Sequence, residues 1–375
     1  MKIRRTEGWV NLGACALVVS AAALIGGTPR SHARPAVDTP VTERVVQFLR
    51  ERFAIPDSVK MTAGPLRSSP FPGFEETTVT ADTTAVQGAG GMSAKALQPQ
   101  TVYVTKDGRY VAVGKLFALG TDPKADVVKD VRETFKIPDT TTLTAGPFEK
   151  SKYLEFHQTK LSTPDGKSQD FFVTRDDRVV VVGDVMPLDV NLRRKALDTF
   201  NLRNQPSVGP ANAPVTIVEF ADLECPTCAR FHAFLENELL PRYGNKVRIV
   251  FKEFPLPMHD WSRVAAIANE CSYQIAPSSF FAFRSMIFSH QTVINVANVR
   301  DTMLQYGEES GVDRLKLAAC IDSQASLPRV EEGKKEGTAV GVNSTPTSFI
   351  NGRMVVAMPP AEQYFALVDE ALAKH

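Results

Sequence analysis

Two cysteines separated by a proline and a threonine, Cys225 and Cys228, have the types and spacing best suited to chemistry in this chain. They follow a β-branched apolar run that starts at Val215 and precede apolar residues at helical spacing, so we expect them where a buried strand turns into a helix. Unpaired N–H groups and the macrodipole at a helix N-terminus favour a thiolate, and Pro226 fits the first turn because no N–H is needed there. A thiolate at Cys225 can attack a disulfide, and Cys228 can then resolve the mixed disulfide. The pattern predicts a two-cysteine redox centre.

The same cysteine spacing also occurs in zinc sites and in structural disulfides. A structural zinc site needs four ligands, and the sequence has no second closely spaced cysteine pair, so His232 and His259 would have to be recruited. A four-residue disulfide ring at a helix start is strained and reducible, which suits exchange better than stapling. We therefore expect no metal and no cofactor.

Further motifs lie on both sides of the cysteine pair. They are Ala213-Pro214-Val215, Glu219-Phe220, Cys225-Pro226-Thr227-Cys228, Phe254-Pro255-Leu256 with His259, and Thr345-Pro346 followed by Thr347 to Gly352. Together they resemble the DsbA-like branch of the thioredoxin superfamily, over residues 206–375. The resemblance implies an α/β thioredoxin fold with a helical insertion at about 260–335. It also implies a cis bond between Thr345 and Pro346, and Thr345 backbone groups that bind an extended substrate peptide.

The acid Glu219 lies on the strand that leads into the cysteine motif, where the resemblance places a buried acid. A carboxylate there can accept the proton of Cys228 as this thiol attacks the mixed disulfide. The alternative is an acid at a solvent-facing strand end. Asp222 and Glu224 oppose a nearby thiolate by their charge, whereas His232, on the helical face of both cysteines, would favour a thiolate when charged. These effects have opposite signs, so the sequence does not define the redox potential.

Composition sets limits on the rest of the protein. The chain has 375 residues, 43% of them hydrophobic, and a net charge of +1, which allows more than one domain and gives no support to nucleic-acid binding. A basic start, an apolar stretch and small residues up to Ala33 predict a secretory signal peptide over 1–33; an uncleaved membrane anchor is the alternative. We therefore expect a periplasmic or otherwise extracytoplasmic location.

Export changes the interpretation of the other cysteines. Cys15 would be lost with the signal peptide, which leaves Cys271 and Cys320 in addition to the redox pair. An even number of cysteines in an oxidising compartment favours a structural disulfide between these two. Two free buried thiols are the alternative.

The region before the redox domain repeats itself. Phe53-Ala-Ile-Pro-Asp57 returns as Phe135-Lys-Ile-Pro-Asp139, and the pattern from Val102 to Gly114 returns from Phe171 to Gly183. The pattern of each copy predicts a helix followed by two or three strands. The region has one histidine, His157, and a lone histidine in an amphipathic strand is more often structural than catalytic. We expect two small α+β repeat modules and a linker helix, at 38–120, 121–187 and 188–205.

The strand pattern of each copy resembles the N-terminal dimerisation module of the DsbC-like disulfide isomerases. Each copy ends in a strand whose open edge would invite pairing, so the resemblance implies a possible homodimer through these modules. The first copy also holds extra residues at 81–100, whose Gly, Ser and Thr content predicts a flexible surface loop.

These features lead to one preferred function and two alternatives. The preferred function is an exported thiol:disulfide oxidoreductase that forms disulfides in reduced, unfolded secreted proteins and is recharged by a quinone-linked membrane partner. The first alternative is an isomerase or reductase that is kept reduced and is shielded by the paired modules. The second is a holdase chaperone that binds unfolded chains and uses the redox pair only secondarily.

Overall fold

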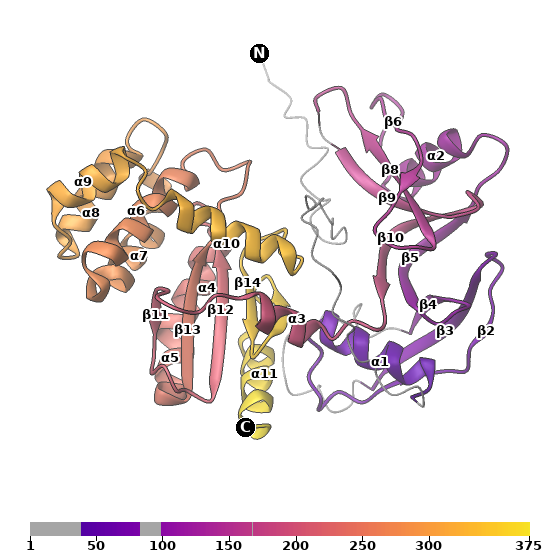
Figure 1. Cartoon of the computed structure of the whole chain (residues 1–375), viewed down its shortest axis with the longest axis horizontal. Helices are drawn as coiled ribbons and strands as arrows, with labels where there is room; N and C mark the ends of the chain where they lie inside the picture. Colours follow the sequence, from indigo (N-terminus) through magenta and orange to yellow (C-terminus); the bar gives the residue numbers. More distant parts are fainter. Residues whose placement is uncertain (1–38, 83–98, 167) are drawn as a thin grey trace, which may run out of the picture. The chain divides into compact units, whose positions relative to one another are not determined.

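A computed structural model describes residues 39–82, 99–166 and 168–375 of the protein (Figure 1). The predicted signal peptide at 1–33 and most of the predicted loop at 81–100 lie outside these residues. No helix in the described part of the chain is long and apolar enough to cross a membrane. The chain forms two compact units, and the second unit contains Asn191–His375 together with the short segment Leu49–Val59.

The first unit is built on a ten-stranded antiparallel sheet within the described residues. Helix α1 (Val41–Arg52) precedes the first five strands, and helix α2 (Pro123–Phe135) precedes the last five. The strands are β1 (Met61–Ala63), β2 (Arg67–Ser68), β3 (Phe74–Ala81), β4 (Gln100–Thr105), β5 (Tyr110–Ala118), β6 (Thr144–Ala145), β7 (Glu149–Lys150), β8 (Phe156–Ser162), β9 (Ser168–Thr174) and β10 (Val179–Pro187).

The strand order of this sheet follows the sequence repeat. It is β1-β3-β4-β5-β10-β9-β8-β6, with β2 beside β3 and β7 beside β8, so corresponding strands stand at equal distances from the centre. Local contacts correspond as well, since the Arg50 and Arg132 guanidinium groups each donate to three carbonyls just after their own helix. Two copies of one chain path therefore meet at the pair formed by β5 and β10.

Glycines allow the close contact at this central pair. Gly114 stands directly opposite Gly183 in the antiparallel register. A Cβ added to Gly183 would lie 2.2 Å from the Val113 carbonyl oxygen, and one added to Gly114 would lie 2.5 Å from the Val182 carbonyl oxygen. The longest strand of the first copy, β5, is thus paired with the longest strand of the second copy, β10, within one chain.

Strand β10 is apolar on both faces of the sheet. Val180 and Val182 pack with α2 residues, whereas Val179 and Val181 pack on the opposite face among aromatic side chains such as Phe156. Successive side chains of a strand point to opposite faces, so an uninterrupted valine run is expected where both faces are covered.

The second unit contains a five-stranded sheet in the order β11-β13-β12-β14-β15. Strands β12 (Val215–Ala221) and β13 (Val247–Glu253) are parallel, and β14 (Thr347–Ile350) is antiparallel to both β12 and β15 (Arg353–Val356). The short β11 (Ser207–Val208) pairs with β13. Asn351 and Gly352 both have positive φ angles, of 45° and 83°, as a tight hairpin turn between β14 and β15 requires. This mixed sheet is the core of a thioredoxin fold.

Helices cover both faces of the five-stranded sheet. On one face α4 (Pro226–Phe234) and α11 (Ala361–Ala373) pack together through Phe231 and Tyr364. On the other face α3 (Leu192–Thr199) contributes Ala196 to a cluster with Phe220 and Phe349. Helix α10 (Leu327–Ala339) packs on this face, because its Gly337 lies against Phe220. The sheet is therefore the middle layer of three.

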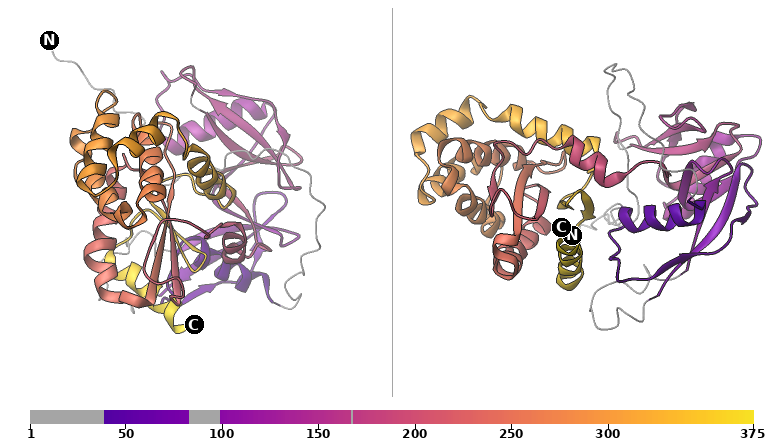
Figure 2. Two further views of the ribbon diagram at one scale, coloured as in Figure 1. Left: turned by 60° about the vertical axis from the view of Figure 1, so that its left-hand side comes forward. Right: turned by 60° about the horizontal axis from the view of Figure 1, so that its bottom comes forward.

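The predicted helical insertion is present. Helices α6–α9 gather beside one end of the sheet in the views of Figures 1 and 2. Their bounds are Ser262–Ile275, Phe280–Ser289, Val299–Glu309 and Arg314–Asp322.

A short segment of the first sequence copy is bound into the second unit. In Leu49–Val59, the Ile55 carbonyl accepts a hydrogen bond from Arg353 at 2.6 Å, and Glu51 accepts one from Arg193 at 2.8 Å. Asp57 forms an ion pair with Lys374 at 2.6 Å. The thioredoxin-type unit is thus completed by residues that precede it by more than a hundred positions in the chain.

Candidate active site

Strand β12 and helix α4 position the two reactive cysteines. The buried strand ends at Ala221, and Cys225 is the N-cap residue of α4, with Pro226 in the first turn. Cys225 is 8% exposed and Cys228, one turn later, is fully buried. Both thiols are free, so the structure represents the reduced form of the pair.

The two cysteines differ in acidity. A hydrogen bond from the Cys228 thiol, together with backbone N–H groups of Cys228 and Thr227, lowers the pKa of Cys225 to about 5 against the opposing effect of burial. Burial and the neighbouring Cys225 raise the pKa of Cys228 well above its ordinary value. Cys225 is therefore a thiolate at neutral pH and is fit to attack, whereas Cys228 needs a proton acceptor before it can act.

The loop before β14 brings the predicted substrate-binding residues to the cysteines. The Thr345–Pro346 bond is cis, as predicted. The Cys225 sulfur lies 3.5 Å from the Thr345 carbonyl oxygen, and β14 runs beside β12. That Thr345 backbone groups pair with a substrate strand stays a prediction.

Glu219 lies inside the protein, so the alternative of a solvent-facing acid is wrong. It is fully buried on β12, where its Oε2 lies 3.3 Å from an Arg284 nitrogen, and burial raises its pKa. Its charge in turn contributes to the raised pKa of Cys228. The structure thus brings Glu219 to the cysteine site, while its role as proton acceptor stays a prediction.

Two neighbouring acids connect the cysteine loop to the insertion. The buried Asp222 carboxylate accepts hydrogen bonds from the Leu256 N–H at 2.7 Å and the Ser262 hydroxyl at 2.5 Å, and lies 2.7 Å from His259 Nδ1. Glu224 accepts from the backbone N–H groups at the start of α6. These carboxylates therefore fix the loop against α6, a role that the sequence did not reveal.

The expectation that a charged His232 favours the thiolate is wrong. Its ring is buried between Phe281 and Phe288, and its Nε2 lies 2.8 Å from the Ser285 hydroxyl. Burial and the neighbouring Arg284 lower its pKa to about 3, so the ring is neutral.

Gln291, just after α7, also contacts the cysteine loop. Its side-chain amide donates to the Leu223 carbonyl at 2.7 Å and to the Cys225 carbonyl at 3.1 Å. No local pattern marks this glutamine, since the contact joins residues far apart in sequence.

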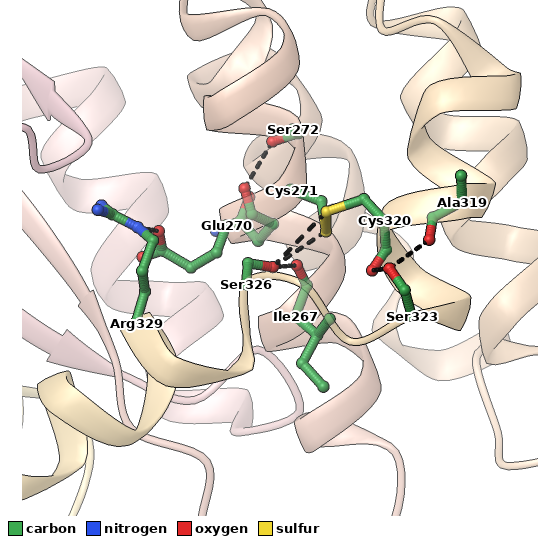
Figure 3. The surroundings of a disulfide bond; sticks show 10 residues. Ile267, Glu270, Cys271, Ser272, Ala319, Cys320, Ser323, Ser326 and Arg329 are labelled. Atoms are coloured by element: carbon green, nitrogen blue, oxygen red, sulfur yellow. Dashed lines mark hydrogen bonds and ion pairs between the residues drawn. A yellow bond between two sulfur atoms is a disulfide. The ribbon is translucent and has the colours of Figure 1, made fainter.

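The other two cysteines lie in the insertion. Cys271 on α6 and Cys320 on α9 are joined by a disulfide with an S–S distance of 2.04 Å (Figure 3). The Ser326 hydroxyl lies 3.0 Å from the Cys271 sulfur and donates to the Ile267 carbonyl. We retain a structural role for this pair as a proposal.

Residues 201–370 match the profile of a family described as Thioredoxin. The chain is 26% identical over 159 residues to Disulfide bond formation protein D of Bacillus subtilis, covering 41% of this chain and 71% of that protein. It is 31% identical over 162 residues to a Na(+)/H(+) antiporter NhaA of Herminiimonas arsenicoxydans, covering 43% of this chain and only 24% of that protein.

Solved structures of two bacterial proteins are similar to slightly less than half of the chain. Oxidised BdbD from Bacillus subtilis is 22% identical, covers 46% of this chain and 95% of its own, and has a TM-score of 0.43. The thiol-disulfide exchange protein alpha-DsbA2 from Wolbachia pipientis is 20% identical, covers 48% of this chain and 95% of its own, and has the same TM-score of 0.43.

The fold, the cysteine pair at a helix start and the family match define a thioredoxin-type domain. With its helical insertion, this domain is similar to DsbA-like thiol:disulfide oxidoreductases, and the matched residues cover less than half of the chain.

Proposed function

We propose that this protein is an exported thiol:disulfide oxidoreductase that forms disulfides in reduced, unfolded secreted proteins through Cys225 and Cys228. The observation that carries the proposal is the difference between the two thiols. A thiolate at Cys225, with a pKa lowered to about 5, stabilises the reduced form of the pair. A pair whose reduced form is stabilised is a strong oxidant, because it gains free energy when it accepts electrons.

The reaction then has two steps. A substrate thiolate attacks the Cys225 sulfur of the Cys225–Cys228 disulfide, and Cys228 leaves as a thiolate that takes up a proton. A second substrate thiolate attacks the substrate sulfur of the mixed disulfide, which releases Cys225 as a thiolate and leaves a disulfide in the substrate. Two electrons pass to the cysteine pair, and a quinone-linked membrane partner would accept them.

A disulfide isomerase is the second candidate, and the central pair β5–β10 is the observation that favours it. Two modules in one chain supply the paired arrangement that an isomerase would otherwise obtain from two subunits. Since the edges of β5 and β10 are used within the chain, a homodimer through the modules would need their outer strands, which are two or three residues long. We therefore expect the isolated protein to be monomeric in light scattering.

Trapping experiments test the assignment of the two thiols. Cys228→Ser should accumulate mixed disulfides with secreted proteins, since Cys225 can attack but nothing resolves the product. Cys225→Ser should trap none. The reverse result would exchange the roles of the two cysteines.

The redox state of Cys225 in cells decides the direction of the reaction. Rapid alkylation in extracytoplasmic extracts should find the pair mostly oxidised in an oxidase and mostly reduced in an isomerase. A holdase would suppress aggregation equally well after replacement of both cysteines by serine, and that result would make the redox activity secondary.

A further inference from the structure

A buried cluster of charges lies beside the cysteine site and extends beyond the predicted acid. Arg284 on α7 stands between two carboxyl groups on neighbouring parallel strands, Glu219 on β12 and Glu253 on β13. Its guanidinium nitrogens lie 3.3 Å from a Glu219 oxygen and 2.7 Å from a Glu253 oxygen. All three side chains are buried, with Glu253 only 2% exposed.

One guanidinium cannot neutralise two carboxylates. An ionised carboxylate without a counter-charge is costly in a site that excludes water, so the two carboxyls are expected to share one proton at neutral pH while Cys228 is held in the disulfide. Burial raises the pKa of both acids, that of Glu253 to about 7. Glu219 Oε1 and Glu253 Oε2 also have no hydrogen-bond partner among the described residues.

The other titratable groups around the cluster do not supply a second cation. Glu270 on α6 pairs with Arg329, the Tyr364 hydroxyl on α11 bonds to Ser348, and the buried His232 on α4 is neutral. Lys252 on β13 is paired with Glu336 at 2.8 Å. The remaining ionisable neighbour is Cys228 itself, which interacts electrostatically with both Arg284 and Glu219.

The geometry points to Arg284 and Glu253 as positioning residues for proton transfer at Cys228. Because Arg284 lies closer to Glu253 than to Glu219, we propose that the mobile proton passes between Glu219 and Cys228, and that Arg284 and Glu253 set how readily Glu219 gives it up. When Cys228 leaves as a thiolate it takes this proton, and Arg284 then faces the new Glu219 carboxylate. In the reverse step Glu219 takes the proton back as Cys228 attacks the mixed disulfide.

This inference rests on the proposed thiol exchange, and one assay separates the two. The reduced full-length protein reacts with excess dithiobis-nitrobenzoate in a stopped-flow instrument. The Cys225 thiolate attacks the reagent and releases the first coloured thiolate; Cys228 then loses its proton, attacks the Cys225 sulfur and releases the second. Two electrons pass from the cysteine pair to the reagent. Only the second phase depends on the proton acceptor, so the midpoint of its pH profile reports on Glu219.

Two substitutions should move this midpoint in opposite directions. Glu253→Gln leaves Arg284 to Glu219 alone, so Glu219 ionises more readily and the midpoint falls, by about 1 to 3 pH units for a close opposite charge. Arg284→Met removes the cation, so the midpoint rises. Arg284→Lys should restore a midpoint near that of the unaltered protein. Opposite shifts are not expected from a merely structural defect, which would change the amplitude or the stability.

Glu336→Gln is the matched control, because it removes a buried carboxyl that pairs with Lys252 and lies outside the cluster. It should leave the midpoint unchanged. If Arg284→Met does not fold, Glu253→Gln alone decides. An unchanged midpoint in Glu253→Gln, with a normal first phase, overturns the inference and leaves the proposed function intact. If the unaltered protein shows no first phase, Cys225 does not react with the reagent, and the proposed function is refuted instead.

Discussion

The central strands of the two sheets are built on the same apolar pattern but are used differently. In the first unit, β10 carries four consecutive buried valines, Val179 to Val182, and meets β5 at a pair of glycines. In the second unit, β12 and β13 are just as deeply buried, yet they carry Glu219, Lys252 and Glu253. One strand pair serves only packing, and the other holds ionisable groups in a dry interior.

The difference shows that ionisable groups in a buried sheet have an energetic cost. Buried charges require partners, and the second unit supplies Arg284 for the two glutamates and Glu336 for Lys252. Replacing such groups by packed apolar side chains is often neutral or stabilising, so their presence is better explained by function than by stability. The first sheet carries no comparable cluster in its described residues, which fits a supporting role.

Loss of the insertion disulfide should give the largest effect on stability. The bond links residues 49 positions apart, and the chain-entropy model gives roughly 4 kcal/mol for a loop of this length. In a Cys225→Ser, Cys228→Ser background, reduction acts on this bond alone among the described cysteines. The free energy of unfolding of the second unit, measured with urea, should fall by this amount. The hydrogen-exchange rates in the ten-stranded sheet should not change. Equal losses of unfolding free energy in both units would show that the two units unfold together.

The glycine pair should be the most sensitive point of the first unit. Gly183→Ala places a Cβ against the backbone of β5, so we expect a loss of about 3 kcal/mol from overpacking. Gly64→Ala is the matched control, since the nearest atom to its Cβ would be 3.8 Å away. Urea unfolding measures both. The first phase of thiol exchange at Cys225 should persist in Gly183→Ala, and its loss would show that the cysteine unit needs an intact first sheet.

The thiolate should make only one redox form of the second unit sensitive to pH. The pKa of Cys225 is lowered from 9.0 to about 5 in the folded reduced protein. Between these values the folded state holds a thiolate and the unfolded state a thiol, so stability rises with pH. This contribution is complete above about pH 9 and is lost as the pH falls through about 5. The oxidised protein lacks the titrating thiol, so urea midpoints of the two forms should converge in acid; parallel profiles would refute the low pKa.

Much of the second unit follows from local patterns. The strand that turns into a helix at Cys225 and the helical insertion after it are both present where the sequence predicts them. The predicted helix after the cysteines is interrupted by a π-helical turn at Leu235–Leu239, and no feature of the amino-acid composition predicts this turn. In the first unit the short strands β1, β2, β6 and β7 were missed, because two or three residues carry no readable alternation.

The site is harder to derive from the sequence than the fold. Cys225, Cys228, Glu219 and the Thr345–Pro346 bond belong to motifs, so they were found. Arg284, Glu253, Gln291 and the contact of Asp222 with His259 were not, because each depends on the packing of the insertion against the sheet. The sequence contained one signal for these residues, which is a charged residue within an apolar helix or strand. At Arg284 this signal indicates a buried partner of opposite charge.

The smallest predicted effect tests whether the two sequence copies are equivalent. Thr77 donates to the Gly64 carbonyl at 2.8 Å, and its counterpart Thr159 donates to the Gly146 carbonyl at 3.1 Å. Both threonines are buried, and replacement by valine keeps their shape while it removes the hydroxyl. Each substitution should therefore cost about 1 kcal/mol in urea unfolding, the net value of one hydrogen bond. The sites share no partner, so the double variant should lose the sum. A loss of unfolding free energy in only one of the two variants would show that the two halves of the sheet, although similar in chain path, do not contribute equally to stability.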